Sequence, residues 1–209
     1  LAPYREAQRL LHAGRIGDLQ EVHLAFGPGQ LCWTQIHSID LIAACLAPAS
    51  IIEVRAQADP ASYSVSDLLL DGDPLLRFAF FATSAGPQGV ISAAGGFDLT
   101  LHGNAGTLTV LNDGQELILR TSAAPGELYW TAQLSKNIPV AAHYGTAAAL
   151  DRLVHSDREA AAADTAATLH SQALLFACAQ SILADGAPVN PDSLSPDLSI
   201  TGRSGSLFA

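Results

Sequence analysis

The fold is decided by residues 75–121, which read LLRFAFFATSAGPQGVISAAGGFDLTLHGNAGTLTVLNDGQELILRT. This stretch consists of short apolar runs separated by turns that contain glycine, and apolar side chains recur at every second position within most runs. A period of two residues is typical of β-strands, and the NDG sequence at residues 112–114 favours a tight hairpin turn. Residues 75–121 therefore predict an antiparallel meander.

Helical and extended patterns flank this meander on both sides. Helical spacing of apolar residues predicts helices over residues 3–14 and 34–47, a short helix from the run AAALDRLVHS and a long helix that ends at Gly186. Alternation predicts strands over residues 19–26 and 50–58. This order predicts an α+β fold, in which one mainly antiparallel sheet carries its helices on one face.

The other face of this sheet is expected to be an interface. The run LLRFAFFA at residues 75–82 is apolar on both sides of its strand, so covering only one face of the sheet would leave apolar side chains in water. A second copy of the chain is the simplest cover, because most protein oligomers are symmetric homo-oligomers. We expect a homo-dimer or a homo-tetramer that forms through the open sheet face.

Composition excludes several classes of partner. The chain has 209 residues, a formal net charge of −10 and no cluster of Lys and Arg, so binding to nucleic acid is not expected. No apolar run approaches the length of a membrane helix, so no membrane partner is expected either. Three widely spaced cysteines among apolar neighbours indicate a reducing compartment, and we expect the protein to be cytoplasmic.

Residues 31–40, LCWTQIHSID, are the strongest candidate for a functional site. They bring Trp33, Gln35, His37 and Asp40 to the start of a predicted helix. Histidine can accept and return a proton near neutral pH, and an aspartate one helical turn later can orient the imidazole or contact a substrate. A structural alternative stays open at this point: His37 and Asp40 form a local polar pair, and Trp33 belongs to the core.

Other polar residues give weaker signals. An aromatic residue at a surface or interface is the simpler interpretation of Tyr144. His155 and His170 lie 15 residues apart without zinc-ligand spacing, and we expect no metal site. Residues 66–74 lack the ligand pattern of a calcium loop and are predicted to form a charged loop.

Four stretches of the sequence carry a resemblance to a known family: YREAQRLLHAGRIGDLQEVHLAF, IHSIDLIAACL, LHGNAGTLTV and AQSILADGAPV. Together they resemble the C-terminal domain of the Gfo/Idh/MocA (glucose-fructose oxidoreductase, inositol dehydrogenase and rhizopine-catabolism) oxidoreductases. The resemblance implies an enzyme of two domains, in which an N-terminal Rossmann domain binds NAD or NADP and the C-terminal domain provides substrate contacts and the oligomer interface. It covers most of residues 3–190, so residues 1–190 are predicted to form this domain and residues 191–209 an irregular tail.

The resemblance also implies roles for individual residues. His37 matches the histidine that moves a proton in the family, and Trp33 occupies a position at which many members carry an acid. Trp33, Gln35, Asp40 and Tyr144 are the candidate substrate contacts.

The chain departs from the family in what it lacks. It contains neither a G-x-G-x-x-G fingerprint after a strand nor the family's Glu-Lys-Pro motif, so we expect it to bind no cofactor by itself. The predicted function is that of the substrate-binding and oligomerisation domain of an NAD(P)-dependent oxidoreductase acting on a sugar, a polyol or a related hydroxyl or carbonyl compound. The alternatives are a non-catalytic homologue that serves as a binding or scaffolding module, and a free-standing binding domain.

Overall fold

The structure is a computed structural model of the 209-residue chain. It describes residues 2–27, 29–58, 64–66, 69–71, 75–94, 96–112, 114, 116–121, 154–155 and 157–201. The α-helices in these ranges are α1 (Ala2–His12), α2 (Gln35–Leu46) and α4 (Arg158–Leu183). The strands of the main sheet are β1 (Leu19–Phe26), β2 (Gly29–Gln30), β3 (Ile51–Ala58), β6 (Leu75–Thr83), β7 (Gln88–Ser92), β8 (Phe97–Gly103), β9 (Gly106–Leu111) and β10 (Glu116–Thr121).

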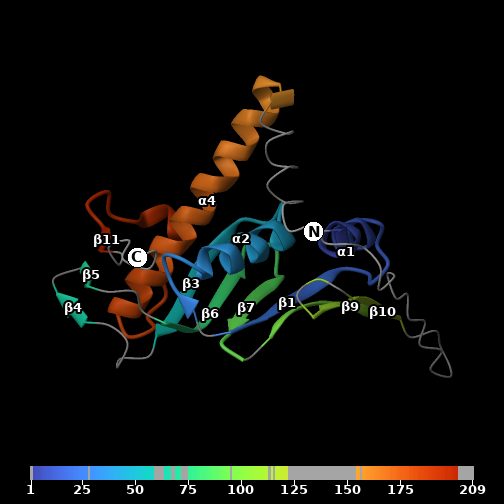
Figure 1. Cartoon of the computed structure of the whole chain (residues 1–209), viewed down its shortest axis with the longest axis horizontal. Coiled ribbons are helices and arrows are strands. Elements are labelled where there is room, and N and C mark those ends of the chain that lie inside the picture. The colour runs from blue at the N-terminus through green and yellow to red at the C-terminus, as the bar shows by residue number, and fades with distance from the viewer. Residues whose placement is uncertain are drawn as a thin grey trace, which may run out of the picture.

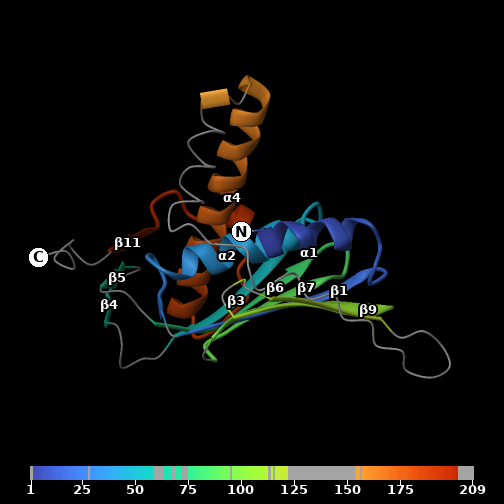
Figure 2. The same cartoon turned by 45° about the vertical axis from the view of Figure 1, so that its right-hand side comes forward.

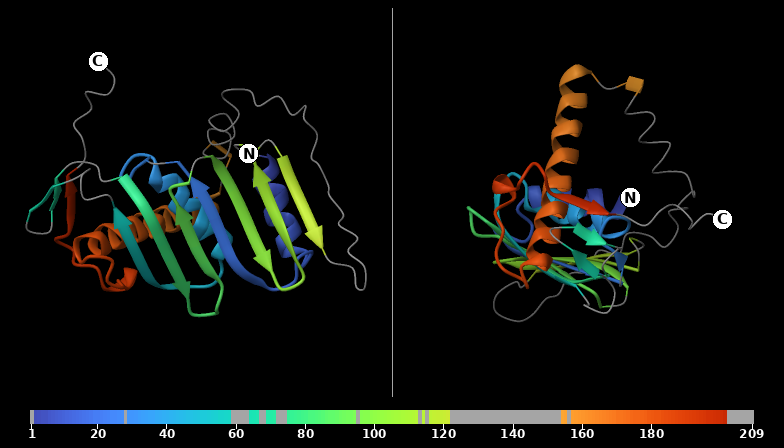
Figure 3. Two further views of the ribbon diagram at one scale, coloured as in Figure 1. Left: turned by 90° about the horizontal axis from the view of Figure 1, so that it is seen from below. Right: turned by 90° about the vertical axis from the view of Figure 1, so that its left-hand side faces the viewer.

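The main sheet has eight strands and is mainly antiparallel. Its order is β10-β9-β8-β1-β7-β6-β2, and β3 also pairs with β6 (Figure 3, left). The predicted meander is confirmed in part: β6 and β7 are antiparallel neighbours, as are β8, β9 and β10, but β1 lies between β7 and β8 and divides the meander in two. The one parallel pairing in the described sheet joins β1 to β7, which makes the sheet mixed. The middle of the sheet is thus formed by β1 and β7, which are distant from each other in sequence.

The helices lie on one face of this sheet, as predicted. Helix α1 contacts β9 and β10, α2 packs over β1 and β7, and α4 packs over β3 and also against α2. Figure 2 shows all three helices on the same side of the strands. The predicted α+β fold class is therefore confirmed.

Buried and partly exposed side chains alternate along the strands, and the buried ones form the sheet side of the core. Val22 and Leu24 of β1 are completely buried beneath the helices, whereas Glu21 and His23 point to the opposite face and are only half-buried. The same alternation continues through Leu99 and its neighbours in β8. The helix-facing side chains of the sheet and the apolar stripes of the helices form one continuous core, because burial removes apolar surface from water.

No described element covers the opposite face of the sheet. The cross-strand registers align one row of side chains on this face, and these side chains are exposed or half-buried. In this row the apolar side chains of Phe80 and Val90 lie between the polar side chains of Arg55 and His23. In order across the sheet it runs Arg55, Phe80, Val90, His23, Thr100, Thr109 and Ile118.

Two segments differ from their sequence-based predictions. Residues 66–74 were expected to form a charged loop, but β4 (Ser64–Ser66) and β5 (Leu69–Asp71) pair there as short antiparallel strands. Part of the tail expected to be irregular forms the 3-10 turn Pro191–Ser193 and the strand β11 (Ser199–Thr201), which pairs in parallel with β5. Strands of three residues are too short for side-chain periodicity to reveal them.

Candidate functional site

Helix α2 carries the candidate site on the side that faces away from the sheet. The helix lies against β1 and β7 (Figure 1). Its buried side chains recur at three- and four-residue intervals, whereas His37 and Asp40 are exposed. Gly89 of β7 allows the helix to lie close to the strands, because a Cβ atom at this position would lie 2.6 Å from Cγ2 of Ile42. The buried residues of α2 are Gln35, Ser38, Ile39, Ile42, Cys45 and Leu46.

The start of α2 is tied to the strand before it. Thr34 is the N-cap residue, but its hydroxyl donates to the carbonyl of Gln30 at 3.1 Å and makes no cap hydrogen bond. The backbone N–H of Trp33 also donates to Gln30, at 3.3 Å. These bonds fold the connection from β2 to α2 back on itself, which places the first turn of α2 beside the sheet.

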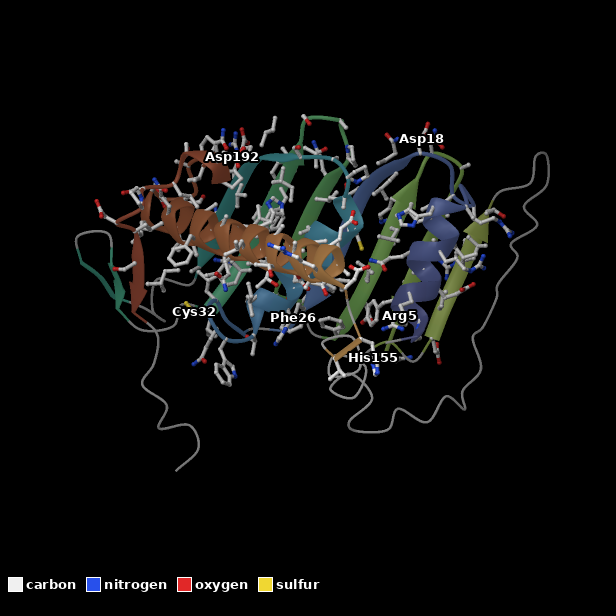
Figure 4. All side chains as sticks on the ribbon, turned by 90° about the horizontal axis from the view of Figure 1, so that it is seen from above. Arg5, Asp18, Phe26, Cys32, His155 and Asp192 are labelled. Carbon is white, nitrogen blue, oxygen red and sulfur yellow. The ribbon has the colours of Figure 1, made fainter. Side chains whose placement is uncertain are left out.

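His37 and Asp40 meet helix α4 at a shallow hollow. Its volume is about 200 Å³, and both helices contribute side chains to its wall. Figure 4 shows α4 crossing above α2 and part of the sheet. The lining residues are Ile36, His37 and Asp40 from α2 and Thr168, Ser171 and Gln172 from α4.

Asp40 bonds to α4 and not to the neighbouring histidine. The hydroxyl of Ser171 donates to Oδ1 of Asp40 at 2.7 Å, and Ser171 itself is only 4% exposed. In the described structure no hydrogen bond joins Asp40 to His37, so the option that Asp40 orients the imidazole is not supported. The carboxylate instead fixes α2 against α4.

Gln35 and Trp33 lie away from this hollow. The side chain of Gln35 is fully buried on the sheet side of α2, where Nε2 donates to the carbonyl of Gly27 at 3.4 Å. Its Oε1 atom is buried without a hydrogen-bond partner. Trp33 is 56% exposed, which does not agree with the alternative that places it in the core. Tyr144 lies outside the described residues.

Sequence reasoning missed the contribution of α4. Thr168, Ser171 and Gln172 share the face of α4 that meets α2, yet the sequence pattern predicts only a long helix here and no site on it. The available signal was a short polar run, TLHSQ at residues 168–172, at the point where α4 changes from exposed to buried. Such a run within an apolar helix is expected where the helix borders a polar site.

A second, larger hollow lies on the other side of α4. It measures about 320 Å³ and is lined largely by the turn after α2, with His170 and Asp192 as its only ionisable lining residues. Asp192 is labelled in Figure 4 on the far side of α4 from Cys32. Although this hollow is larger, neither of its ionisable side chains is held by another described side chain, whereas Ser171 holds Asp40, so we place the site between α2 and α4.

The described residues do not form a dinucleotide or metal site. A nicotinamide cofactor needs a glycine-rich turn between a strand and a helix that packs on a parallel sheet, and the antiparallel pairings described above provide no such turn. Within the described ranges, no cluster of three or more His, Cys, Asp or Glu side chains could hold a metal ion. None of the described helices combines the length and apolar character needed to cross a bilayer.

No family model and no curated protein matches the chain by sequence. Solved structures, however, share its fold. An oxidoreductase from Pseudomonas syringae is 18% identical with a TM-score of 0.62, and the match covers 90% of this chain and 61% of that one. An inositol dehydrogenase homolog from Azotobacter vinelandii, complexed with NADH and myo-inositol, is 15% identical with a TM-score of 0.63 over 90% and 61%. A super-repressor mutant of Gal80p from Saccharomyces cerevisiae is 11% identical with a TM-score of 0.63 over 91% and 62%.

These identities are low, so the matches show the fold. The chain has the fold of the C-terminal domains of Gfo/Idh/MocA-type oxidoreductases, and the predicted resemblance is confirmed at that level. The chain spans 61% or 62% of the length of these solved chains. The fold occurs both in oxidoreductases and in a protein named as a repressor, so it does not by itself decide activity.

Proposed function

We propose that the chain is the substrate-binding and oligomerisation domain of an NAD(P)-dependent oxidoreductase that acts on a sugar, a polyol or a related hydroxyl or carbonyl compound. One observation carries this proposal: the exposed side chains of His37 and Asp40 meet at a hollow in an oxidoreductase fold. The A. vinelandii neighbour, which was crystallised with NADH and myo-inositol, supports a polyol as the substrate class. In this proposal a separate dinucleotide-binding domain holds NAD or NADP, because the described residues lack the glycine-rich turn that such a cofactor needs.

His37 is the proposed general acid or base. Its side chain is exposed at the wall of the hollow, within reach of a small ligand, and imidazole can take a proton from a hydroxyl group and return it. Asp40, one helical turn later, presents a carboxylate to the same space. A hollow of about 200 Å³ is smaller than the roughly 300 Å³ at which ligand pockets usually begin. The site is therefore completed by another element, and we assign that role to the dinucleotide-binding domain.

Kinetics of the full-length protein test this proposal. His37→Ala is expected to lower kcat/KM for oxidation of myo-inositol or a related polyol by roughly 10²- to 10⁴-fold, the usual contribution of general acid–base catalysis. His12→Ala is the matched control, because His12 is also exposed but lies at the end of α1. Undiminished turnover of the His37→Ala protein would refute the assignment.

The alternative is a non-catalytic homologue that serves as a binding or scaffolding module. The exposed Trp33, at a position where the resemblance leads us to expect an acid, favours this alternative. Titration of the full-length protein with NADH and NADPH, followed by fluorescence, separates the two. A catalytic protein binds at least one of them saturably, whereas a scaffold with a lapsed site has no need to bind either.

Self-association through the open sheet face is the second part of the proposal. Phe78 and Phe80 of β6 lie half-buried on a face that no described element covers, next to Val90 of β7. Arg55 of β3 lies beside Phe80 and His23 of β1 lies beside Val90, and such an apolar centre with polar flanks is typical of protein interfaces. A second copy of this face is the proposed partner, in a homo-dimer or homo-tetramer.

Sedimentation of the full-length protein tests the association. Phe80→Asp is expected to shift the protein to a smaller species, since it places a charge in the proposed interface. Leu169→Asp is the control, because Leu169 is 60% exposed on α4, on the helix side of the sheet. An unchanged assembly in the Phe80→Asp protein would contradict an interface on the sheet.

The cytoplasmic location also remains a proposal. Cys45 and Cys178 are buried thiols outside any disulfide, which supports a reducing compartment.

A further inference from the structure

One carboxylate in the α2–α4 hollow is held by a buried hydroxyl. Ser171 and Asp40 lie 131 residues apart in sequence, and the Ser171 hydroxyl donates to Oδ1 of Asp40 at 2.7 Å. Ser171 is nearly buried, whereas Asp40 is exposed. No described residue makes a hydrogen bond to Oδ2. One oxygen of the carboxylate is thus occupied and the other is left for solvent or a ligand.

The hydrogen bond fixes the direction of the carboxylate. An aspartate side chain has three staggered χ1 positions, and a bond from a buried donor selects one of them. Ionised carboxylates accept hydrogen bonds and cannot donate them. Asp40 therefore presents one preoriented acceptor within the wall of the hollow.

The α4 wall adds further acceptors. The Thr168 hydroxyl donates its proton to the carbonyl of Asp164 at 2.9 Å, so its oxygen can only accept from a ligand. Gln172 contributes an amide that can accept or donate. Neither Lys nor Arg is among the residues that line the hollow. Apart from the imidazole of His37, the polar groups of this wall are thus mainly acceptors, and Asp40 is the one carboxylate among the lining residues.

We propose that Ser171 is a positioning residue that holds Asp40 as an acceptor for a ligand hydroxyl, and that the α2–α4 hollow selects neutral polyhydroxylated ligands over anionic sugar acids. This inference rests on the proposed function, in which the hollow receives the substrate. A neutral polyol brings several hydroxyl donors to these acceptors. A sugar carboxylate brings a second negative charge next to Asp40, and like charges in a partly desolvated site repel.

Binding measured without turnover tests the proposal. Calorimetric titration of the full-length protein compares myo-inositol with glucuronate, in the wild type and in Ser171→Ala, Asp40→Ala and the double variant. Ser171→Ala is expected to weaken myo-inositol binding about three- to ten-fold, since the carboxylate is released to other rotamers and loses a charge-assisted hydrogen bond. In the Asp40→Ala background Ser171→Ala has no further effect, because Ser171 acts through Asp40.

Ser181→Ala is the matched control on the same helix. Ser181 is also a buried serine with hydrogen bonds, but it bonds to β3 and to the turn after α4, away from the hollow. It is expected to lower stability and leave ligand affinity unchanged. A wild type that binds glucuronate as tightly as myo-inositol, or that binds neither, overturns the proposal, as does a Ser171→Ala effect that persists without Asp40. Selective binding without turnover refutes the proposed function alone, and turnover with binding unaffected by Ser171→Ala refutes this inference alone.

Discussion

Ser181→Ala is expected to lower the free energy of unfolding by about 2 kcal/mol. The Ser181 hydroxyl accepts from the backbone N–H of Ala56 at 2.9 Å and donates to the carbonyl of Ala187 at 2.7 Å. Ala56 is 0% exposed, so its N–H would stay buried without a partner, which costs about 1–3 kcal/mol. Ala187 is exposed, so water can replace the hydrogen bond to its carbonyl. The higher helix propensity of alanine offsets about 0.5 kcal/mol of the loss.

Urea unfolding followed by circular dichroism measures this change. With a slope of about 2 kcal/mol/M, the urea midpoint is expected to fall by about 1 M at unchanged slope. The melting temperature should fall by roughly 4–8 °C for a chain of this size. Ser193→Ala is the control, because its exposed hydroxyl donates to Asn190 at 2.9 Å, and such a surface change is expected to cost less than about 0.5 kcal/mol.

The reasoning is refuted if Ser181→Ala costs no more than this control. That result would mean that the Ala56 N–H finds another partner once the hydroxyl is removed. The Ser181 hydroxyl accepts a hydrogen bond from a backbone N–H of β3 that would otherwise pair with a further strand. The loss of unfolding free energy therefore also measures how much the contact of α4 with β3 stabilises this part of the sheet.

Three further predictions follow from packing and burial. Gly89→Ala is expected to cost about 1–3 kcal/mol in urea unfolding, since its Cβ would lie 2.6 Å from Ile42 Cγ2 and α2 would have to shift. Burial raises the pKa of Cys45 and of Cys178 from 9.0 to about 12. The native state then keeps protons that the unfolded chain loses, so stability should fall between about pH 9 and pH 12, and a Cys45→Ala/Cys178→Ala protein should lack that part of the fall. In the native protein, both thiols should react with iodoacetamide at pH 8 far more slowly than after unfolding, as mass spectrometry can show.

Local patterns were sufficient to place the elements of the candidate site. The apolar spacing in residues 34–47 predicted the helix that the structure shows as α2, and His37 falls on its exposed side. The same pattern did not assign Gln35 to the buried side, because one polar residue near a helix start gives no periodic signal. The role of Thr34 was also missed, since the helix start bonds to Gln30 in the preceding strand.

Sequence alone determined the α+β class, the strands and hairpins of residues 75–121 and the helix that carries His37, because these follow from side-chain periods of 2 and 3.6 residues within short segments. Tertiary structure decided which distant segments meet. It paired β1 with β7 in parallel and brought Ser171 to Asp40 across 131 residues. Such contacts leave no mark on local periodicity, because they are selected by the packing of α4 on α2 and on the sheet as a whole. The acceptor-rich wall between the two helices is therefore a property of the fold, and no single stretch of the sequence contains it.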